Sequence, residues 1–178
     1  MQVITGAYRG RKLLSVGPQT RPTLTRIKES LFSIISDRID GSVVLDLFAG
    51  SGALGIECIS RGAVKTYLVD SNSDAIKVLK KNTERMANFE ILQKDYLQAL
   101  KFFTGKTKFD LIFLDPPYMS DYGEKAIDYV LSNNLLKKDG LIIFEHTSKK
   151  CLPSDNDLFI ITRSKKYGDK VIDFITAK

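Results

Sequence analysis

The tetrapeptide Asp115-Pro116-Pro117-Tyr118 is the segment of this chain best suited to chemistry on an amino group. Two successive prolines cannot continue a strand, and they hold the chain in a stiff, extended shape. The Asp115 carboxylate and the Pro116 carbonyl can then act as fixed acceptors for the hydrogens of an exocyclic amine. Such acceptors would localise the lone pair of the amine and stabilise the positive charge that develops during in-line methyl transfer. Tyr118 would stack on a base that has left its own stack. The alternative is a proline-stiffened loop whose aspartate caps a helix.

A glycine-rich segment, Asp46–Gly55, follows an apolar strand candidate. Gly50, Gly52 and Gly55 fit G-x-G-x-x-G between a strand and a helix, which is the context this pattern requires. Gly50 and Gly52 permit a sharp turn and a close approach to a ligand, and the next helix offers free N–H groups to an anion. Asp70, 20 residues after Gly50, is placed to accept hydrogen bonds from ribose hydroxyls. The pattern predicts a nucleoside cofactor, although glycine-rich turns also occur where a helix packs closely on a sheet.

Asp46 bears on which cofactor this loop binds, because the glycine spacing also fits NAD. A carboxylate just before the glycines would repel a pyrophosphate, whereas it suits an ammonium group. S-adenosylmethionine carries an ammonium and a sulfonium and no phosphate, so Asp46 favours it. Asp95 could accept from the adenine amino group, or it could simply be the N-cap of the following helix. The other expected cofactor contacts are Phe48, Ala49, Ser71 and Tyr96.

Apolar strand candidates alternate with helix-length segments over most of the chain. The predicted strands are Val43–Leu47, Thr66–Val69, Phe89–Leu92, Leu111–Leu114 and Leu141–Phe144, and the predicted helices are Ala53–Arg61, Ser73–Met86, Tyr96–Phe103 and Glu124–Ser132. This alternation indicates an α/β fold with a parallel sheet covered on both faces. Two further strands, Asp157–Arg163 and Val171–Ile175, are joined by a connection too short for a parallel crossover. We therefore expect a doubly wound, mostly parallel seven-stranded sheet that ends in an antiparallel hairpin, with ligands beyond the carboxyl ends of the strands.

The amino-terminal region is basic. The formal net charge is +6, and the six cations that precede the first acidic residue, Glu29, equal it: Arg9, Arg11, Lys12, Arg21, Arg26 and Lys28. Basic residues concentrated at one end suit a polyanion, because neutralised phosphates release counterions. We expect Arg9, Arg11, Lys12, Arg21 and Arg26 to contact RNA; a solvated basic arm is the alternative.

The same region predicts a small hairpin and a helix. Gln2–Thr5 and Lys12–Val16 read as two short strands joined through Gly6–Arg11. From Thr23 to about Ile39, apolar residues recur at helical spacing, with Thr23 or Thr25 as N-cap. No repeat or linker divides the chain, so we expect one domain over residues 1–178, with an RNA-facing extension at 1–40 and a catalytic core at 41–178.

Several function classes are disfavoured. No apolar run approaches the roughly 20 residues that cross a bilayer, and no signal for export is visible. The two cysteines, Cys58 and Cys151, are far apart and indicate a reduced, cytoplasmic protein. No Cys/His cluster has the spacing of metal ligands. The lone His146 is expected to be structural, and Glu145 either touches substrate or cofactor or ends a strand in solvent.

At these residues the chain resembles the RsmD family, the bacterial 16S ribosomal RNA guanine-N2 methyltransferases. The matching segments, which span nearly the full length, are Ile4-Thr5-Gly6 through Gly10-Arg11-Lys12-Leu13, Arg21-Pro22-Thr23 through Arg26, Glu29 and Leu31-Phe32, then Asp46–Gly55, Asp115–Tyr118 and Tyr167-Gly168-Asp169. The resemblance implies a Rossmann-like class I fold, S-adenosylmethionine as cofactor, and a flipped guanine in 16S rRNA or a small-subunit particle as substrate. It also implies that Arg21, Thr23 and Glu29 border the cleft, and that the amino-terminal hairpin helps to grip RNA. The chain departs from the family pattern at Thr25 and Lys170, which we expect to lie away from the chemistry.

Three rival functions are weighed against this one. A DNA adenine-N6 methyltransferase could use the same tetrapeptide, but it would need a separate region to read duplex DNA. An NAD-dependent oxidoreductase is disfavoured by Asp46 and by the lack of a hydride-transfer partner residue. A non-catalytic RNA-binding or ribosome assembly protein would not need the Asp115 carboxylate. No interface is obvious, and we expect a monomer.

Overall fold

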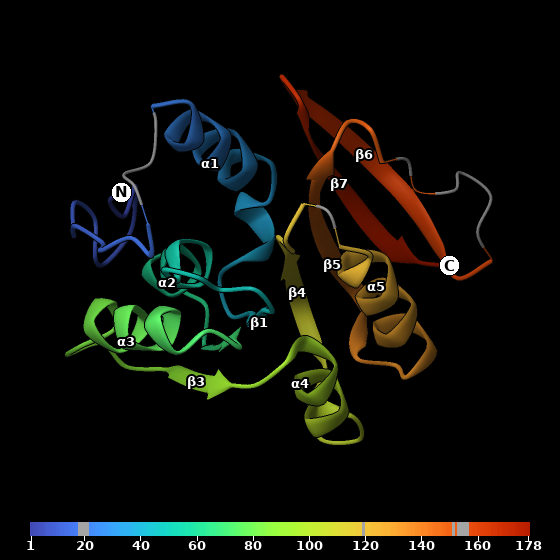
Figure 1. Cartoon of the computed structure of the whole chain (residues 1–178), viewed down its shortest axis with the longest axis horizontal. Helices are drawn as coiled ribbons and strands as arrows, with labels where there is room; N and C mark the ends of the chain where they lie inside the picture. Colours follow the sequence, from blue (N-terminus) through green and yellow to red (C-terminus); the bar gives the residue numbers. More distant parts are fainter. Residues whose placement is uncertain (18–21, 119, 151, 153–156) are drawn as a thin grey trace.

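A seven-stranded sheet in the order β3-β2-β1-β4-β5-β7-β6 forms the centre of the computed structural model (Figure 1). The structure describes residues 1–17, 22–118, 120–150, 152 and 157–178. The strands are β1 (Val43–Asp46), β2 (Lys65–Asp70), β3 (Phe89–Gln93), β4 (Phe109–Leu114), β5 (Leu136–Thr147), β6 (Phe159–Tyr167) and β7 (Lys170–Ala177). The helices are α1 (Pro22–Ile34), α2 (Ala53–Ser60), α3 (Ser73–Asn82), α4 (Tyr96–Phe103) and α5 (Tyr122–Ser132), with a short 3₁₀ helix at Ser36–Arg38.

The order of the strands reverses between β1 and β4, which lie side by side and parallel at the middle of the sheet. From this point the chain runs outward through β2 and β3 on one side, and through β5, β7 and β6 on the other. Asp46, the last residue of β1, is in register with Phe113 of β4. The carboxyl ends of these two strands therefore meet at the position where doubly wound sheets bind ligands.

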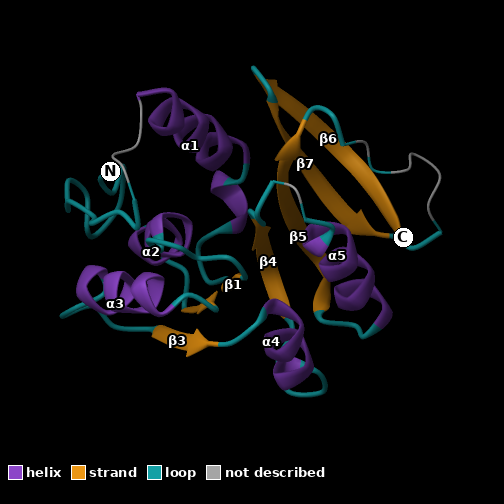
Figure 2. Cartoon of the chain, viewed as in Figure 1, coloured by secondary structure: helices purple, strands orange, loops and turns teal. Residues whose placement is uncertain are grey.

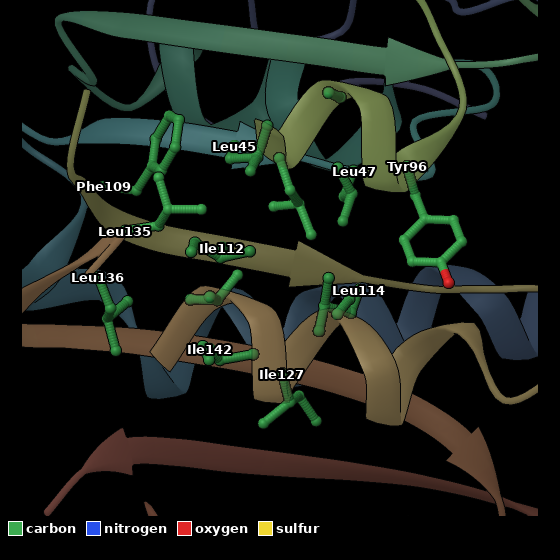
Figure 3. Packing of buried hydrophobic residues seen from close by; sticks show 14 of the residues in the cluster. Leu45, Leu47, Tyr96, Phe109, Ile112, Leu114, Ile127, Leu135, Leu136 and Ile142 are labelled. Atoms are coloured by element: carbon green, nitrogen blue, oxygen red, sulfur yellow. The ribbon is translucent and has the colours of Figure 1, made fainter. Parts of the chain in front are cut away.

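Helices cover both faces of the sheet, and this buries the strand side chains on each side (Figure 2). Helices α1 and α2 pack on one face, against a cluster that includes Val44 of β1, Leu111 and Phe113 of β4 and Phe174 of β7. Helices α4 and α5 pack on the other face. Figure 3 shows this second cluster, which contains Leu45, Ile112 and Ile142 of neighbouring strands and Ile127 of α5.

The predicted carboxyl-terminal hairpin is confirmed. β7 pairs antiparallel with β5 on one side and with β6 on the other. β6 begins at Phe159, two residues later than predicted, but both strands extend further toward the turn, which shortens to Gly168 and Asp169. The expected α/β class, with a mostly parallel seven-stranded sheet and an antiparallel end, is therefore the observed fold.

The amino-terminal segment differs from the predicted hairpin. A single antiparallel bridge joins Gln2 and Lys12 in place of two strands. The N–H groups of Ile4 and Thr5 donate to the carboxylate of Glu57, at 2.8 and 3.0 Å, and the N–H of Ala7 donates to the carbonyl of Ser60. The two arms still exchange backbone hydrogen bonds, such as that from the N–H of Val3 to the carbonyl of Arg11 at 3.0 Å, and the hydrogen bonds to α2 add to these.

Several helix boundaries also differ. α1 ends at Ile34 and not near Ile39, α2 ends one residue early at Ser60, and α5 begins two residues early at Tyr122. α1 begins at Pro22, so neither Thr23 nor Thr25 is its N-cap, and the preceding Arg21 lies outside the described residues. Proline is favoured at the first helical position because its missing N–H would have no intrahelical partner there. α3 ends at Asn82, four residues before the predicted end, and the chain then takes a left-handed conformation at Arg85 (φ +63°) that cannot continue a helix.

None of the helices in the described ranges has both the length and the apolar character that spanning a bilayer requires.

Candidate active site

The glycine loop connects β1 to α2, and its three glycines have different surroundings. Gly50 and Gly52 both adopt left-handed conformations, with φ of +53° and +78°. A Cβ added at Gly52 would lie 2.7 Å from Leu79 of α3, and one added at Gly55 would lie 2.4 Å from Leu68 of β2. A Cβ at Gly50 would meet no atom within 4 Å. Gly52 and Gly55 therefore allow close packing behind the loop, whereas Gly50 lines the open space in front of it.

Asp70 ties the glycine loop to the end of β2. Its carboxylate accepts hydrogen bonds from the N–H of Gly50 at 2.9 Å and from the N–H of Asn72 at 2.8 Å. Each carboxylate oxygen has a second lone pair, so these bonds leave acceptor capacity for a ligand. These two hydrogen bonds fix the Asp70 carboxylate at the end of β2, beside the glycine loop, which is the position predicted from the sequence.

Three cavities lie along the carboxyl edge of the sheet, and Phe48 lines all three. The first, of about 330 Å³, lies between the glycine loop, α1 and the ends of β4 and β5. The second, of about 320 Å³, is lined by Asp70 and the whole Asp115–Tyr118 tetrapeptide. The third, of about 70 Å³, is bounded by Ser71, Asp95 and Tyr96, among others. The predicted loop, acidic partner and tetrapeptide are therefore brought together at one edge; Gly52 is set behind the loop.

The smallest cavity has an aromatic wall. Tyr96 stacks on Tyr122 with ring centroids 4.8 Å apart, and it makes a tilted contact of 5.8 Å with Phe48. Asp95, which also borders this cavity, accepts from the N–H of Leu97 at 2.9 Å and so is the N-cap of α4. The capping interpretation of Asp95 is confirmed, and its position at the cavity is compatible with a ligand contact as well. Tyr122 was not expected from the sequence.

Asp46 is a buried carboxylate at the floor of the first cavity, 2% exposed. It accepts a hydrogen bond of 3.2 Å from the N–H of Gly55. Among the described residues, no lysine, arginine or histidine forms an ion pair with it. Burial raises the pKa of Asp46 to about 7, since the bond from Gly55 offsets only part of this effect and the Asp70 charge adds to it. A carboxylate in this state suits a cationic ligand.

Asp115 follows β4 directly and lines both larger cavities. Its side chain opens to the cleft, but protein surrounds it closely. The resulting loss of hydration, together with the nearby Glu145 carboxylate, raises the pKa of Asp115 to about 7, against the opposing effect of Lys170. Asp121 occupies the N-cap position of α5, so Asp115 does not serve as a helix cap. The alternative interpretation of the tetrapeptide is therefore wrong on this point.

Lys170 and Glu145 form an ion pair in the wall of the first cavity. The Lys170 ammonium also lies 5.2 Å from the ring centroid of Tyr118, which is 48% exposed. Burial lowers the pKa of Lys170, but the pairing with Glu145 outweighs this effect and the net pKa is raised. The expectation that Lys170 lies away from the chemistry is wrong: the β5–β7 pairing brings it beside the end of β4. Glu145 also faces this cavity and is paired with Lys170, so it is not a strand end that lies in solvent.

His146 is buried outside these cavities. Its Nε2 lies 3.0 Å from Asp173, its Nδ1 lies 2.9 Å from the carbonyl of Thr147, and its ring stacks on Phe144. Burial alone lowers the pKa of His146, but the hydrogen bonds to Asp173 and Thr147 raise it overall. The contacts agree with the structural role expected for a lone histidine.

The basic residues of the amino-terminal region divide into two groups. Arg9, Lys12 and Arg26 are exposed, and Arg11 is half-buried and donates to the carbonyl of Glu84 at 2.8 Å. Arg21 lies outside the described residues. Lys28, which was counted with them as a cation available to a polyanion, is buried and pairs with Glu57 at 2.9 Å. The count of cations thus overstated the basic surface by at least one.

A buried polar network holds the amino-terminal segment against the cleft. Glu57, fully buried on α2, accepts from the N–H groups of Ile4 and Thr5 and pairs with Lys28 and Arg61. Further along, Asn82 of α3 bonds both the N–H and the carbonyl of Leu14, and it also donates to the carbonyl of Ser51 in the glycine loop at 2.8 Å. Sequence reasoning missed both residues, because single polar positions within helices carry no pattern.

Comparison with known proteins identifies the family. The family model described as "Conserved hypothetical protein 95" matches residues 1–176. Ribosomal RNA small subunit methyltransferase D of Haemophilus influenzae is 37% identical over 157 residues, which cover 85% of this chain and 81% of that protein. The chain belongs to the RsmD family.

Two further RsmD-like relatives extend over almost the whole chain. The Bacillus subtilis protein YlbH, named as a candidate rRNA methyltransferase, is 38% identical over 173 residues and 94% of each protein. A solved structure of the candidate methyltransferase yhhF from Escherichia coli superposes with a TM-score of 0.87 at 29% identity, covering 100% of this chain and 98% of that one. The cleft described above is therefore the candidate active site of an RsmD-family methyltransferase.

Proposed function

We propose that this methyltransferase transfers a methyl group from S-adenosylmethionine to the exocyclic N2 amine of a guanine in 16S rRNA. The observation that carries the proposal is the shared cavity of Asp46, Gly50 and Asp115, because it puts a cofactor loop and an amine-binding tetrapeptide on one surface. The names of the relatives, as small-subunit rRNA methyltransferases, supply the substrate class.

The residues present fit S-adenosylmethionine. Asp46 offers a buried carboxylate for an ammonium group, and Gly50 leaves space where any side chain would intrude. Asp70 retains acceptor capacity for ribose hydroxyls, and the cavity beside Tyr96 is apolar enough for a planar ring. When bound, the cofactor supplies an electrophilic methyl group. Asp46, Phe48, Ala49, Gly50, Asp70, Ser71, Asp95 and Tyr96 would hold it, with Gly52 shaping the loop.

The tetrapeptide would prepare the amine. The ionised Asp115 carboxylate accepts a hydrogen bond from the amino group and stabilises the positive charge that grows on nitrogen. Pro116 and Pro117 restrict the backbone, so that little reorganisation is needed at the moment of reaction. Tyr118 offers an exposed ring on which the flipped base can stack. Asp115 can take up the proton that the methylated amine loses afterwards.

The principal rival, methylation of adenine N6 in DNA, uses the same tetrapeptide. Relatives that match most of the chain favour RNA, since their names are those of rRNA methyltransferases. A decisive test incubates the purified protein with labelled S-adenosylmethionine and small-subunit RNA lacking the modification, with duplex DNA in parallel. We expect label in RNA alone, and digestion to nucleosides followed by mass spectrometry should yield N2-methylguanosine. Label in DNA alone, or in another nucleoside, would refute the proposal.

Cofactor binding is expected to depend on pH through Asp46. Because its pKa is about 7 and only the ionised form attracts an ammonium, the cofactor Kd should rise about tenfold per pH unit below 7 and level off above it. Isothermal titration calorimetry from pH 5.5 to 8.5 measures this profile. Asp46→Asn should weaken binding at pH 8 and abolish the pH dependence. Asp115→Asn should keep the dependence; if Asp46→Asn also keeps it, another group is responsible.

A further inference from the structure

Strand β6 forms one outer edge of the sheet and is strongly basic. It pairs with β7 on one side only, at the end of the strand order. Arg163, Lys165 and Lys166 are all exposed, and the strand Phe159–Tyr167 contains no acidic residue. A charge count along the sequence does not predict this patch, because residues 29–178 are formally neutral in sum.

The register of β6 shows which way its cations point. Arg163 is opposite Phe174 of β7, and Lys165 is opposite Ile172. Opposed residues of an antiparallel pair project from the same face of the sheet. Phe174 and Ile172 belong to the cluster beneath α1 and α2, so Arg163 and Lys165 project on the side of α1. Lys166 projects from the other face.

A direct contact joins this end of β6 to α1. The hydroxyl of Tyr167 lies 2.6 Å from that of Ser30. Arg26 is exposed and precedes Ser30 by four residues, so the two lie on one face of the helix. Lys165 and Arg163 therefore project beside this contact between β6 and α1, and Arg26 lies across it on α1; we name Arg163 and Lys165 the hairpin strip (Figure 1 shows α1 beside the β6–β7 end).

The hairpin strip is linked to the candidate active site through the turn that follows it. The chain passes from Tyr167 through a tight turn to Lys170, and both Lys170 and Ile172 line the cavity that contains Asp115. Figure 1 shows the amino-terminal segment, which carries the exposed Arg9 and Lys12, on the other side of α1 from the β6–β7 hairpin. Exposed cations thus lie on both sides of α1, whose residues Ile27 and Leu31 line the same cavity.

We propose that the hairpin strip is a second contact surface for the phosphate backbone of the RNA substrate, beyond the amino-terminal region. The inference rests on the proposed function, since it names how that substrate is held. Extended strands place alternate side chains about 7 Å apart, and Arg163 and Lys165 therefore offer two separate charges to a polyanion that follows the strand. Such contacts fix the orientation of the RNA and carry no sequence information.

The test compares two double variants, one in the hairpin strip and one elsewhere on the surface, each of which loses two positive charges. Arg163→Gln/Lys165→Gln neutralises the strip, and the control Lys101→Gln/Lys108→Gln neutralises two exposed lysines, one in the last turn of α4 and one just before β4, neither of which lines the cleft. We expect the strip variant to weaken RNA binding about tenfold at 150 mM salt and to lower the slope of log K against log salt by about 1.5. The control should bind as wild type does.

Kinetics separate this surface from the catalytic machinery. The strip variant should raise KM for RNA, while kcat at saturating RNA, the cofactor Kd and the thermal midpoint stay at wild-type values. If both double variants bind RNA equally well, or lose affinity equally, the inference is overturned. Failure of the wild-type protein to methylate rRNA would instead overturn the proposed function, so the two failures are distinguishable.

Discussion

Asp115→Asn is expected to slow methyl transfer by about 10²- to 10³-fold, with less than a threefold change in the cofactor Kd. The substitution keeps the shape of the side chain but replaces an ionised acceptor with a neutral amide, so the charge developing on the amine is no longer stabilised. Losses of this size are typical when one preorganised electrostatic contact is removed from an active site. Single-turnover transfer of labelled methyl groups measures the rate, and calorimetry measures the cofactor affinity. Asp128→Asn, an exposed position on α5, is the matched control and should react at the wild-type rate.

The pH dependence of the methyl-transfer rate provides a second test of the role of Asp115. Its pKa is about 7 in the free protein and the active form is the carboxylate, so the rate constant should rise with pH through 7 and then level off. Asp115→Asn should lose this rise. A variant that retains both the rate within threefold and the pH profile of the wild type would rule out the assigned role of Asp115.

Glu57→Ala is expected to have the largest effect on stability, about 3–5 kcal/mol. The substitution leaves the Lys28 ammonium buried without its partner, and the N–H groups of Ile4 and Thr5 lose their acceptor. For a chain of this size such a loss lowers the thermal midpoint by about 10 °C, which differential scanning calorimetry detects. Glu90→Ala, which removes a surface pair with Lys65 at 3.4 Å, should change stability by about 1 kcal/mol or less.

Two observations check that the network anchors the amino-terminal segment. Amide hydrogen exchange at Ile4 and Thr5 should become fast in Glu57→Ala, with β4 unchanged. Burial raises the pKa of Glu57, but the hydrogen bond from Ile4 and the pair with Lys28 have a larger, opposite effect. The pKa of Glu57 therefore lies below its usual value of 4.5. Its stabilising contribution is therefore complete above pH 4.5 and is lost as the pH falls through the lowered pKa. If the thermal midpoint of Glu57→Ala equals that of Glu90→Ala, Glu57 does not anchor the amino-terminal segment.

Features with a local pattern could be predicted from the sequence. The apolar runs around Leu45 and Ile112 indicated buried parallel strands, because both faces of such strands are covered. The glycine spacing after Asp46 located the loop, and the prolines after Asp115 located the tetrapeptide, since both depend on residues with restricted backbone behaviour. The doubly wound topology then placed these segments at one edge, where the structure has them.

Features that depend on tertiary contact could not be predicted in this way. Lys28 looked like one more cation of a basic arm, and only the packing of α1 on α2 reveals its buried partner Glu57. Lys170 looked remote because it is 55 residues from Asp115 in sequence, and the antiparallel return of β7 makes it a neighbour of the cleft. Tyr122 lies outside the predicted helix Glu124–Ser132 and matched no motif, whereas its ring stacks on Tyr96.

The central position of β1 constrains how this protein can be synthesised. β1 ends at Asp46 and pairs on one side with β4, which begins about 60 residues later at Phe109. At translation speeds of about 5–20 residues per second, one edge of β1 stays unpaired for roughly 3 to 12 seconds while the nascent chain grows. Leu45, fully buried in the finished sheet, lacks its β4 neighbour Ile112 during this interval. Nascent chains that stall before Phe109 thus present an open apolar edge, the kind of surface that chaperones cover.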